Sequence, residues 1–289
     1  MRSILFFLLF WVASTLVGQS GLGFQLYDNQ GNRVNFSELL EAASVADVVF
    51  LGELHNNPIS HWLQRELTEA LYLQKKERLM LGAEMFETDD QLLLDEYLSG
   101  KINQKNFEEE AKLWKNYATD YKPLIEFAKT RSIPFYGTNI PRRYANLVFR
   151  SGLEALAGLS SSARNQLLPP LPIPLDLNLP AYQKMVKSMG SHGGNSPENM
   201  VKAQAIKDAC MGYVISQVWK PGHTLIHLNG SYHSDDREGI VWYLNNYRPG
   251  LNILTLTTVE QEYPGKSDET NRNKADFLLV VAETMTKTY

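Results

Sequence analysis

One four-residue pattern, Gly-x-x-His, occurs twice in this chain, each time directly after an apolar run that predicts a strand. The first copy is 52–55, after the run at 48–51, and the second is 230–233, after the run at 224–228. In a sheet with helices on both faces, side chains just beyond the carboxyl ends of the strands converge on one crevice. Glycine permits a sharp turn there, and histidine can bind a metal or transfer protons near neutral pH. We therefore expect one site assembled from both turns.

Strand-like runs alternate with helical patterns along most of the chain. The predicted strands are 46–51, 79–83, 133–137, 224–228, 252–257 and 277–281. The predicted helices are 37–43, 58–75, 91–98, 107–115, 122–130, 142–156 and 237–247. Such alternation predicts an α/β fold with a mostly parallel sheet flanked by helices.

The middle of the chain departs from this alternation. Residues 152–219 contain no convincing strand, and the proline-rich segment 168–174 must be extended because proline and the residue before it resist helix. Helices are predicted at 182–189 and 197–217. We interpret 152–219 as a helical insertion over the carboxyl edge of the sheet, within a single domain that spans 21–289.

The amino-terminal residues have the pattern of a secretory signal peptide. Arg2 precedes the apolar stretch 4–12, which fades into small and polar residues up to Ser20. The stretch is short for a membrane span. We therefore expect residues 1–20 to direct export to the periplasm or the medium. No cysteine follows the apolar stretch, so we do not expect a lipoprotein.

Composition excludes several classes of function. The net charge of −4 offers no bulk electrostatic attraction for nucleic acid or an anionic membrane surface. Cys210 is the single cysteine, which excludes an intrachain disulfide and an all-thiolate metal site. The chain also lacks the glycine-rich nucleotide-binding signatures and the Gly-x-Ser-x-Gly elbow of serine hydrolases.

Polar side chains follow four of the predicted strands: Glu53 and His55, then Glu84, then Asn139, and finally Asn229 and His233. Imidazole and carboxylate groups together can hold a divalent metal or activate water. If the protein is an enzyme, we expect Glu53, His55, Glu84 and His233 to be its catalytic residues. The same chemistry would allow His55, Glu84 and His233 to hold a metal.

The other histidines are weaker candidates for this site. His61 lies six residues after His55, a spacing that does not align two ligands on one helix face, so we expect a supporting role. His192 could reach the crevice or lie in a plain loop. His223 and His227 are expected to be half-buried core residues.

Several segments, taken in order, resemble the ChaN-type haem-binding uptake family. They are Leu51 to Pro58 with His61, Gly82 to Phe86, Tyr121 to Leu124, Thr138 to Arg142, Met200 to Asp208 and Asn229 to His233. The resemblance extends over about 46–258. The wider superfamily includes the Tiki metalloproteases, the TraB and GumN proteins and the erythromycin esterases.

The resemblance to ChaN-type proteins implies an exported haem-binding protein of iron uptake, connected to the membrane only through an uptake system. It implies haem held in face-to-face pairs across a homodimer, with a tyrosine on the iron. The tyrosines considered are Tyr117, Tyr121, Tyr144, Tyr182 and Tyr232. Tyr121 is preferred because it belongs to a matching motif. Arg142 and Arg143 suit the propionates, and His55 and His233 are further haem-contacting candidates.

The resemblance to the superfamily's enzymes implies a different function. Those enzymes use the paired Gly-x-x-His motifs and a glutamate, which correspond here to His55, His233 and Glu84. A metal-dependent or Glu/His-dependent hydrolase is therefore the alternative, because a haem carrier has no evident need for an acid–base set. The family resemblance favours haem binding.

Overall fold

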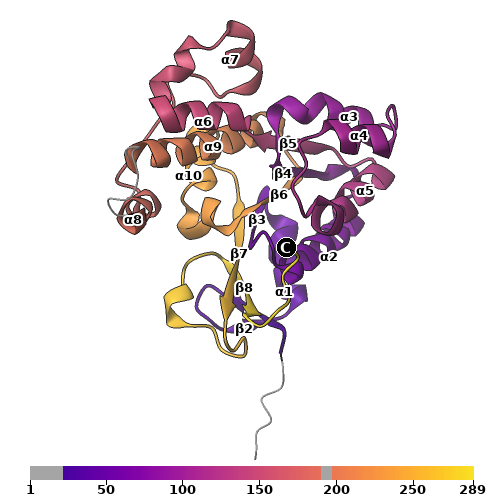
Figure 1. Ribbon diagram of the computed structural model, residues 1–289. Coiled ribbons are helices and arrows are strands. Elements are labelled where there is room, and N and C mark those ends of the chain that lie inside the picture. The colour runs from indigo at the N-terminus through magenta and orange to yellow at the C-terminus, as the bar shows by residue number, and fades with distance from the viewer. Residues whose placement is uncertain (1–21, 190–196) are drawn as a thin grey trace, which may run out of the picture.

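The computed structural model describes residues 22–189 and 197–289. Its eight-stranded sheet has the order β2-β1-β8-β7-β3-β6-β4-β5 (Figure 1). The parallel strands are β3 (Val48–Glu53), β4 (Leu79–Glu87), β5 (Phe135–Asn139), β6 (Thr224–Gly230), β7 (Ile253–Gln261) and β8 (Phe277–Ala282). The antiparallel strands at one edge are β1 (Phe24–Asp28) and β2 (Arg33–Val34). The predicted α/β class with a mostly parallel sheet is confirmed.

Helices cover both faces of the sheet (Figure 1). One face carries α1 (Phe36–Val45), α2 (Pro58–Lys75), α3 (Gln91–Leu98), α4 (Gln104–Glu110) and α5 (Lys122–Arg131). The other carries α6 (Arg142–Ser151), α9 (Pro197–Val218) and α10 (Ile240–Tyr247). Val49 and Leu51 of β3 face the first group, whereas Val48 and Phe50 face the second. Because side chains alternate along a strand and both faces are buried, the strand appears in the sequence as a continuous apolar run.

Helix α2 begins at the predicted residue for a local reason. The side chain of Asn57 accepts hydrogen bonds from the amides of Ile59 and Ser60, and Pro58 occupies the first helical position, where no amide is needed. Helix α4 differs from the predicted 107–115. Asn103 caps it and accepts a hydrogen bond from the amide of Asn106, so the helix starts early and ends at Glu110. Residues 111–116 form a loop instead.

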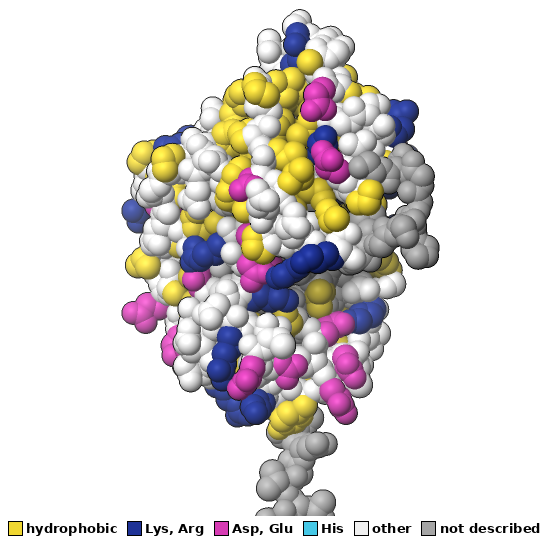
Figure 2. All heavy atoms as spheres, turned by 90° about the vertical axis from the view of Figure 1, so that its left-hand side faces the viewer, with side chains coloured by type: hydrophobic (Ala, Val, Ile, Leu, Met, Phe, Trp, Pro, Cys, Tyr) yellow, Lys and Arg dark blue, Asp and Glu magenta, His cyan; other side chains and the backbone are white. Residues whose placement is uncertain are grey.

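The insertion is helical, as expected. It contains α7 (Ser161–Leu167), the extended segment before α8 (Pro180–Met189), and α9. Helix α9 covers more than the carboxyl edge, because Met211 and Ile215 pack with Phe50 on the face of the sheet. Figure 2 shows apolar side chains gathered over this upper part of the molecule. Throughout the described ranges, no helix is long and apolar enough to cross a membrane.

The segment after β8 returns to the carboxyl edge of the sheet (Figure 1). The amide of Thr288 donates to the carbonyl oxygen of Asn56 at 3.0 Å. The hydroxyl of Thr288 donates to Asp120 Oδ2 at 2.8 Å. These two bonds place Tyr289 next to the turn that follows β3.

Candidate functional site

The two Gly-x-x-His turns lie side by side. Strands β3 and β6 are neighbours, with Gly52 opposite Asn229 and Glu53 opposite Gly230. Gly230 is required by a close approach, because a Cβ there would lie 2.8 Å from both Cε1 and Nε2 of His55. The glycine of the second turn therefore makes room for the histidine of the first, at the edge of the sheet where ligands usually bind.

The imidazole of His55 is held by Glu53. His55 Nδ1 lies 2.9 Å from Glu53 Oε1, which also accepts a hydrogen bond from the Tyr121 hydroxyl at 2.6 Å. Gln64 Nε2 donates to the other carboxylate oxygen at 2.6 Å. Burial alone would lower the pKa of His55, but the hydrogen bond to Glu53 and the nearby charge of Glu84 raise it. The ring packs edge-on against Trp114, and the side chain is 34% exposed.

His233 lies between two buried carboxyl groups. Its Nε2 is 3.2 Å from Glu84 Oε1, and its Nδ1 is 2.5 Å from Asp208 Oδ1. The amide of Gly230 donates to Glu84 Oε2 at 2.8 Å. Burial favours a neutral imidazole, but the charges of Glu84 and Asp208 outweigh it and raise the pKa of His233 to about 10. His233 is therefore an imidazolium at neutral pH.

The pKa values of the two carboxyl groups are shifted in opposite directions. Burial would raise the pKa of Glu84, but the charge of His233 and its hydrogen bond hold that pKa well below the usual range. Burial raises the pKa of Asp208, and the charge of His233 offsets this only in part. Glu84 is thus held in its anionic form beside His233 Nε2, and Asp208 fixes the opposite ring nitrogen, Nδ1.

The donor set does not fit the expected metal site. Both ring nitrogens of His233 are committed to carboxyl groups, and His55 Nδ1 is committed to Glu53. Among the described residues there is no group of three His, Cys, Asp or Glu side chains placed to hold a metal ion. A divalent metal on His55, Glu84 and His233 is not supported.

Two neighbouring cavities open beside this cluster. The larger has a volume of about 690 Å³ and the smaller about 370 Å³, and both are lined by Glu87, Lys112, Trp114 and Arg142. The smaller cavity reaches His55, Glu84 and His233. The larger is completed by Leu113, Lys115, Asn116, Arg143 and Tyr289. Much of this lining comes from the loop 111–116.

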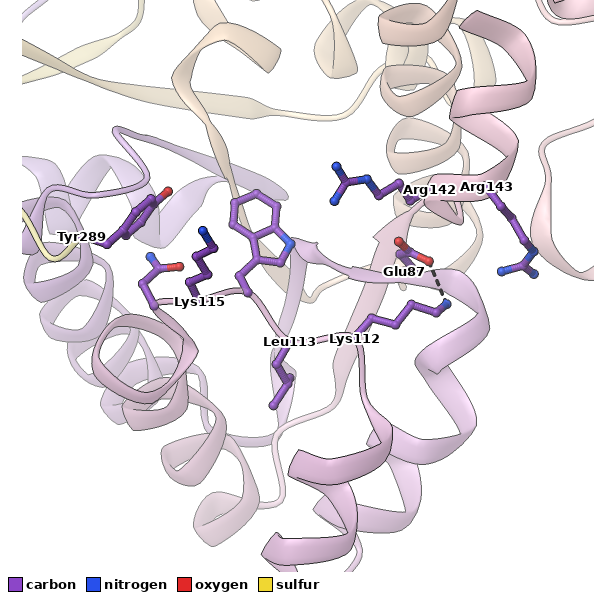
Figure 3. A pocket seen from close by; sticks show the side chains of 9 residues that line it. Glu87, Lys112, Leu113, Lys115, Arg142, Arg143 and Tyr289 are labelled. Atoms are coloured by element: carbon purple, nitrogen blue, oxygen red, sulfur yellow. Dashed lines mark hydrogen bonds and ion pairs between the residues drawn. The ribbon is translucent and has the colours of Figure 1, made fainter. Parts of the chain in front are cut away.

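The two arginines predicted to bind the haem propionates differ in their ion pairing. Figure 3 shows Arg142 and Glu87 at one end of the larger cavity, and Lys115 and Tyr289 at the other. Arg142 forms no ion pair with any described residue. Arg143 points away from Arg142 and is paired with Asp89. Of the two, Arg142 has the charge available for a ligand.

The structure places Tyr121 in the core. Its side chain is 3% exposed and its hydroxyl is committed to Glu53. Burial, together with the charge of Glu53, raises the pKa of Tyr121 far above its usual range, which opposes the phenolate that ferric iron prefers. An iron atom could reach this oxygen only if Glu53 were displaced.

The other tyrosines considered from the sequence do not line the cavities either. Tyr117 and Tyr182 are buried, Tyr144 packs against Arg143, and the Tyr232 hydroxyl donates to a backbone carbonyl at 2.9 Å. Tyr289, in contrast, is 60% exposed and lines the larger cavity. Sequence reasoning missed it because nothing near residue 289 indicates that the segment returns to β3.

The remaining histidines largely behave as expected. His61 is buried, with Nε2 3.1 Å from the His55 carbonyl oxygen, so it supports the turn. His227 is buried between Thr138 and Asn229, which is deeper than the predicted half-burial. His223 is half-buried, and His192 lies outside the described residues. Asp208 and Gln204, which contact His233, were missed as site residues, although both belong to a segment that carried the family resemblance.

Fold and site together define a class: a doubly wound α/β protein with a buried acid–base cluster and ligand-sized cavities at the carboxyl edge of its sheet. Residues 39–244 match the family model described as haem-binding uptake, Tiki superfamily, ChaN. The match covers well over half of the chain, and the chain belongs to this family.

Several solved structures are similar to this one to different degrees. A Campylobacter jejuni structure described as cofacial heme binding to ChaN has a TM-score of 0.66 at 20% identity, covering 89% of this chain and 96% of its own. A Bacillus cereus protein has a TM-score of 0.48 at 12% identity, with 85% and 90% covered. The type III effector HopBA1 has 0.47 at 12%, with 86% and 92% covered. No curated protein sequence matches the chain.

Proposed function

We propose that this protein binds haem in the larger cavity as a step in haem uptake. Family membership supports haem as the ligand. The observation that carries the proposal is the cavity of about 690 Å³, which lies in the general range for sites of small molecules and cofactors, roughly 300–1,000 Å³. Its lining combines an aromatic side chain, an exposed phenol and two cations, Lys115 and Arg142, that pair with no described residue. These groups suit a flat apolar ring with two carboxylates and a ferric centre.

Tyr289 is the side chain of this cavity best suited to ferric iron. Its phenol is exposed and forms no hydrogen bond with any described residue, whereas Tyr121 would have to leave a hydrogen bond to a buried carboxylate. Arg142 is placed to hold a propionate. A single tyrosinate ligand suits a carrier that must release its cargo. Pairing of two loaded chains face to face, and export directed by residues 1–20, complete the proposal.

A hemin titration with matched phenylalanine variants tests the ligand. Wild-type protein should give a saturable Soret spectrum at about one haem per chain, with a phenolate charge-transfer band. Tyr289→Phe should remove that band and weaken binding by about tenfold or more, whereas Tyr121→Phe should leave both within about twofold. Sedimentation of the same samples should show dimers only with hemin. Loss of the band in Tyr121→Phe alone would assign the iron to Tyr121 after all.

Hydrolysis at the smaller cavity is the second candidate function. It is favoured by the state of His55, whose Nδ1 is fixed by Glu53 while no described residue hydrogen-bonds its Nε2. An imidazole oriented by a carboxylate is suited to take a proton from water, and the imidazolium of His233 nearby could stabilise developing negative charge. Since the pKa of His55 is raised, its base form and the rate should grow as pH rises through that pKa.

The hydrolase proposal is tested with metal-free protein and a panel of chromogenic esters, lactones and amides. His55→Ala should lower any rate by about 10²–10⁴-fold without changing hemin affinity. His223→Ala is the matched control, because this half-buried histidine lies outside both cavities. Equal rates in wild type and His55→Ala, or no turnover of the panel by wild type, would reject the role.

A further inference from the structure

The smaller cavity carries positive charge that no residue of 22–189 or 197–289 neutralises. Lys207 and Arg142 line it, and neither forms an ion pair with any residue in the described ranges. The carboxylates nearby are already engaged: Glu84 with His233, and Glu87 with Lys112 at 2.8 Å. Two cationic side chains therefore line the same small cavity without a counter-ion from the part of the chain that the structure describes.

Lys207 is partly withdrawn from water, so its charge favours a bound anion. It is half-buried on α9, one residue before Asp208 and three after Gln204, both of which contact His233. Removing a lysine ammonium from water is unfavourable unless an anion compensates it. Helix α9 is fixed by its packing on the sheet. The same helix therefore positions Lys207 at the cavity and Asp208 at His233.

Helix α6 adds to the positive potential of this cavity. It begins at Arg142, no side chain caps it, and its first turn contains no acidic residue. A helix N-terminus carries a partial positive charge and exposes free amides, so it favours a bound anion. Because Arg142 and Ala145 of this first turn line the cavity, this partial charge adds to the charges of the two side chains.

We propose that the smaller cavity is a separate binding site for a compact molecule with an oxyanion group, either a carboxylate or a phosphate. Arg142 would hold the oxyanion with its planar guanidinium and Lys207 with its ammonium. The rest of the molecule would then lie against His55, Glu84 and Trp114. The cavity of about 370 Å³ limits it to a small organic acid or phosphate ester. Because Arg142 lines both cavities, a haem propionate would compete for it, so the anion site is defined on haem-free protein.

The test uses haem-free protein titrated separately with inorganic phosphate and with acetate, at constant ionic strength set with chloride. The readout is the NMR signal of the His55 imidazole, which lines the cavity. We expect a saturable shift with at least one of the two probes, and the tighter one identifies the chemical class. Lys207→Gln and Arg142→Gln should each weaken binding by about tenfold.

Lys115→Gln is the matched control, because Lys115 is an exposed cation that lines only the larger cavity. It should leave anion affinity within about twofold. The proposal is overturned if neither probe saturates, or if Lys115→Gln weakens binding as much as Lys207→Gln. It is also overturned if Lys207→Gln weakens hemin but not phosphate or acetate, since Lys207 would then belong to the haem site. Failure of hemin to bind leaves this result unaffected.

Discussion

Replacing His233 with glutamine is expected to lower the free energy of unfolding by about 3–5 kcal/mol at pH 7. The imidazolium is buried between Glu84 and Asp208, and its loss leaves the Glu84 carboxylate buried without a cation. Urea denaturation followed by circular dichroism measures the change. His223→Gln is the control, because His223 is half-buried outside the cluster and should cost no more than about 0.5 kcal/mol. A loss below about 1 kcal/mol for His233→Gln would show that the cluster is not charged.

The same variant should reveal the pH dependence of this contribution. The pKa of His233 is raised from 6.5 to about 10, so folding stabilises the charged form. The contribution is complete below the unfolded value of 6.5 and is lost as pH rises through about 10. The difference in unfolding free energy between wild type and His233→Gln should therefore shrink between pH 7 and 10. A difference that stays constant over this range would contradict the assignment.

Gly239→Ala is expected to lower the free energy of unfolding by about 3 kcal/mol or more. Gly239 has φ +52° and ψ −120°, a conformation that side chains rarely adopt. A Cβ there would also overlap the carbonyl oxygen of His233 and lie 3.4 Å from Asp208 Cγ. The substitution therefore combines backbone strain with a steric clash against His233 and Asp208.

Gly250→Ala separates these two causes. Gly250 has φ +88°, but a Cβ there would meet nothing within 4 Å. It should cost only the strain of a left-handed residue, about 1–2 kcal/mol. Chemical denaturation of both variants provides the comparison. Equal losses would mean that the contact between residue 239 and His233 contributes nothing.

Local signals in the sequence were sufficient for most of the fold. Helix α2 was predicted over its full length because Asn57 and Pro58 mark its start. The parallel strands were predicted because burial on both faces produces unbroken apolar runs. Helix α4 was misplaced because Asn103 caps it earlier than its hydrophobic pattern suggests. That shift matters for the site, since it releases the loop 111–116 to line both cavities.

The sequence by itself determined that Glu53, His55, Glu84 and His233 would meet, because they follow strands whose ends share one edge of the sheet. Only the tertiary structure decided which partners these side chains have and therefore which of them are charged. Asp208 reaches His233 because α9 packs on the sheet, and Tyr289 reaches the larger cavity because Thr288 binds Asn56. The periodicity of a helix shows which side is buried, but not which polar residue of that side meets a strand end. Charge pairing between distant segments depends on that docking, and no local pattern encodes it.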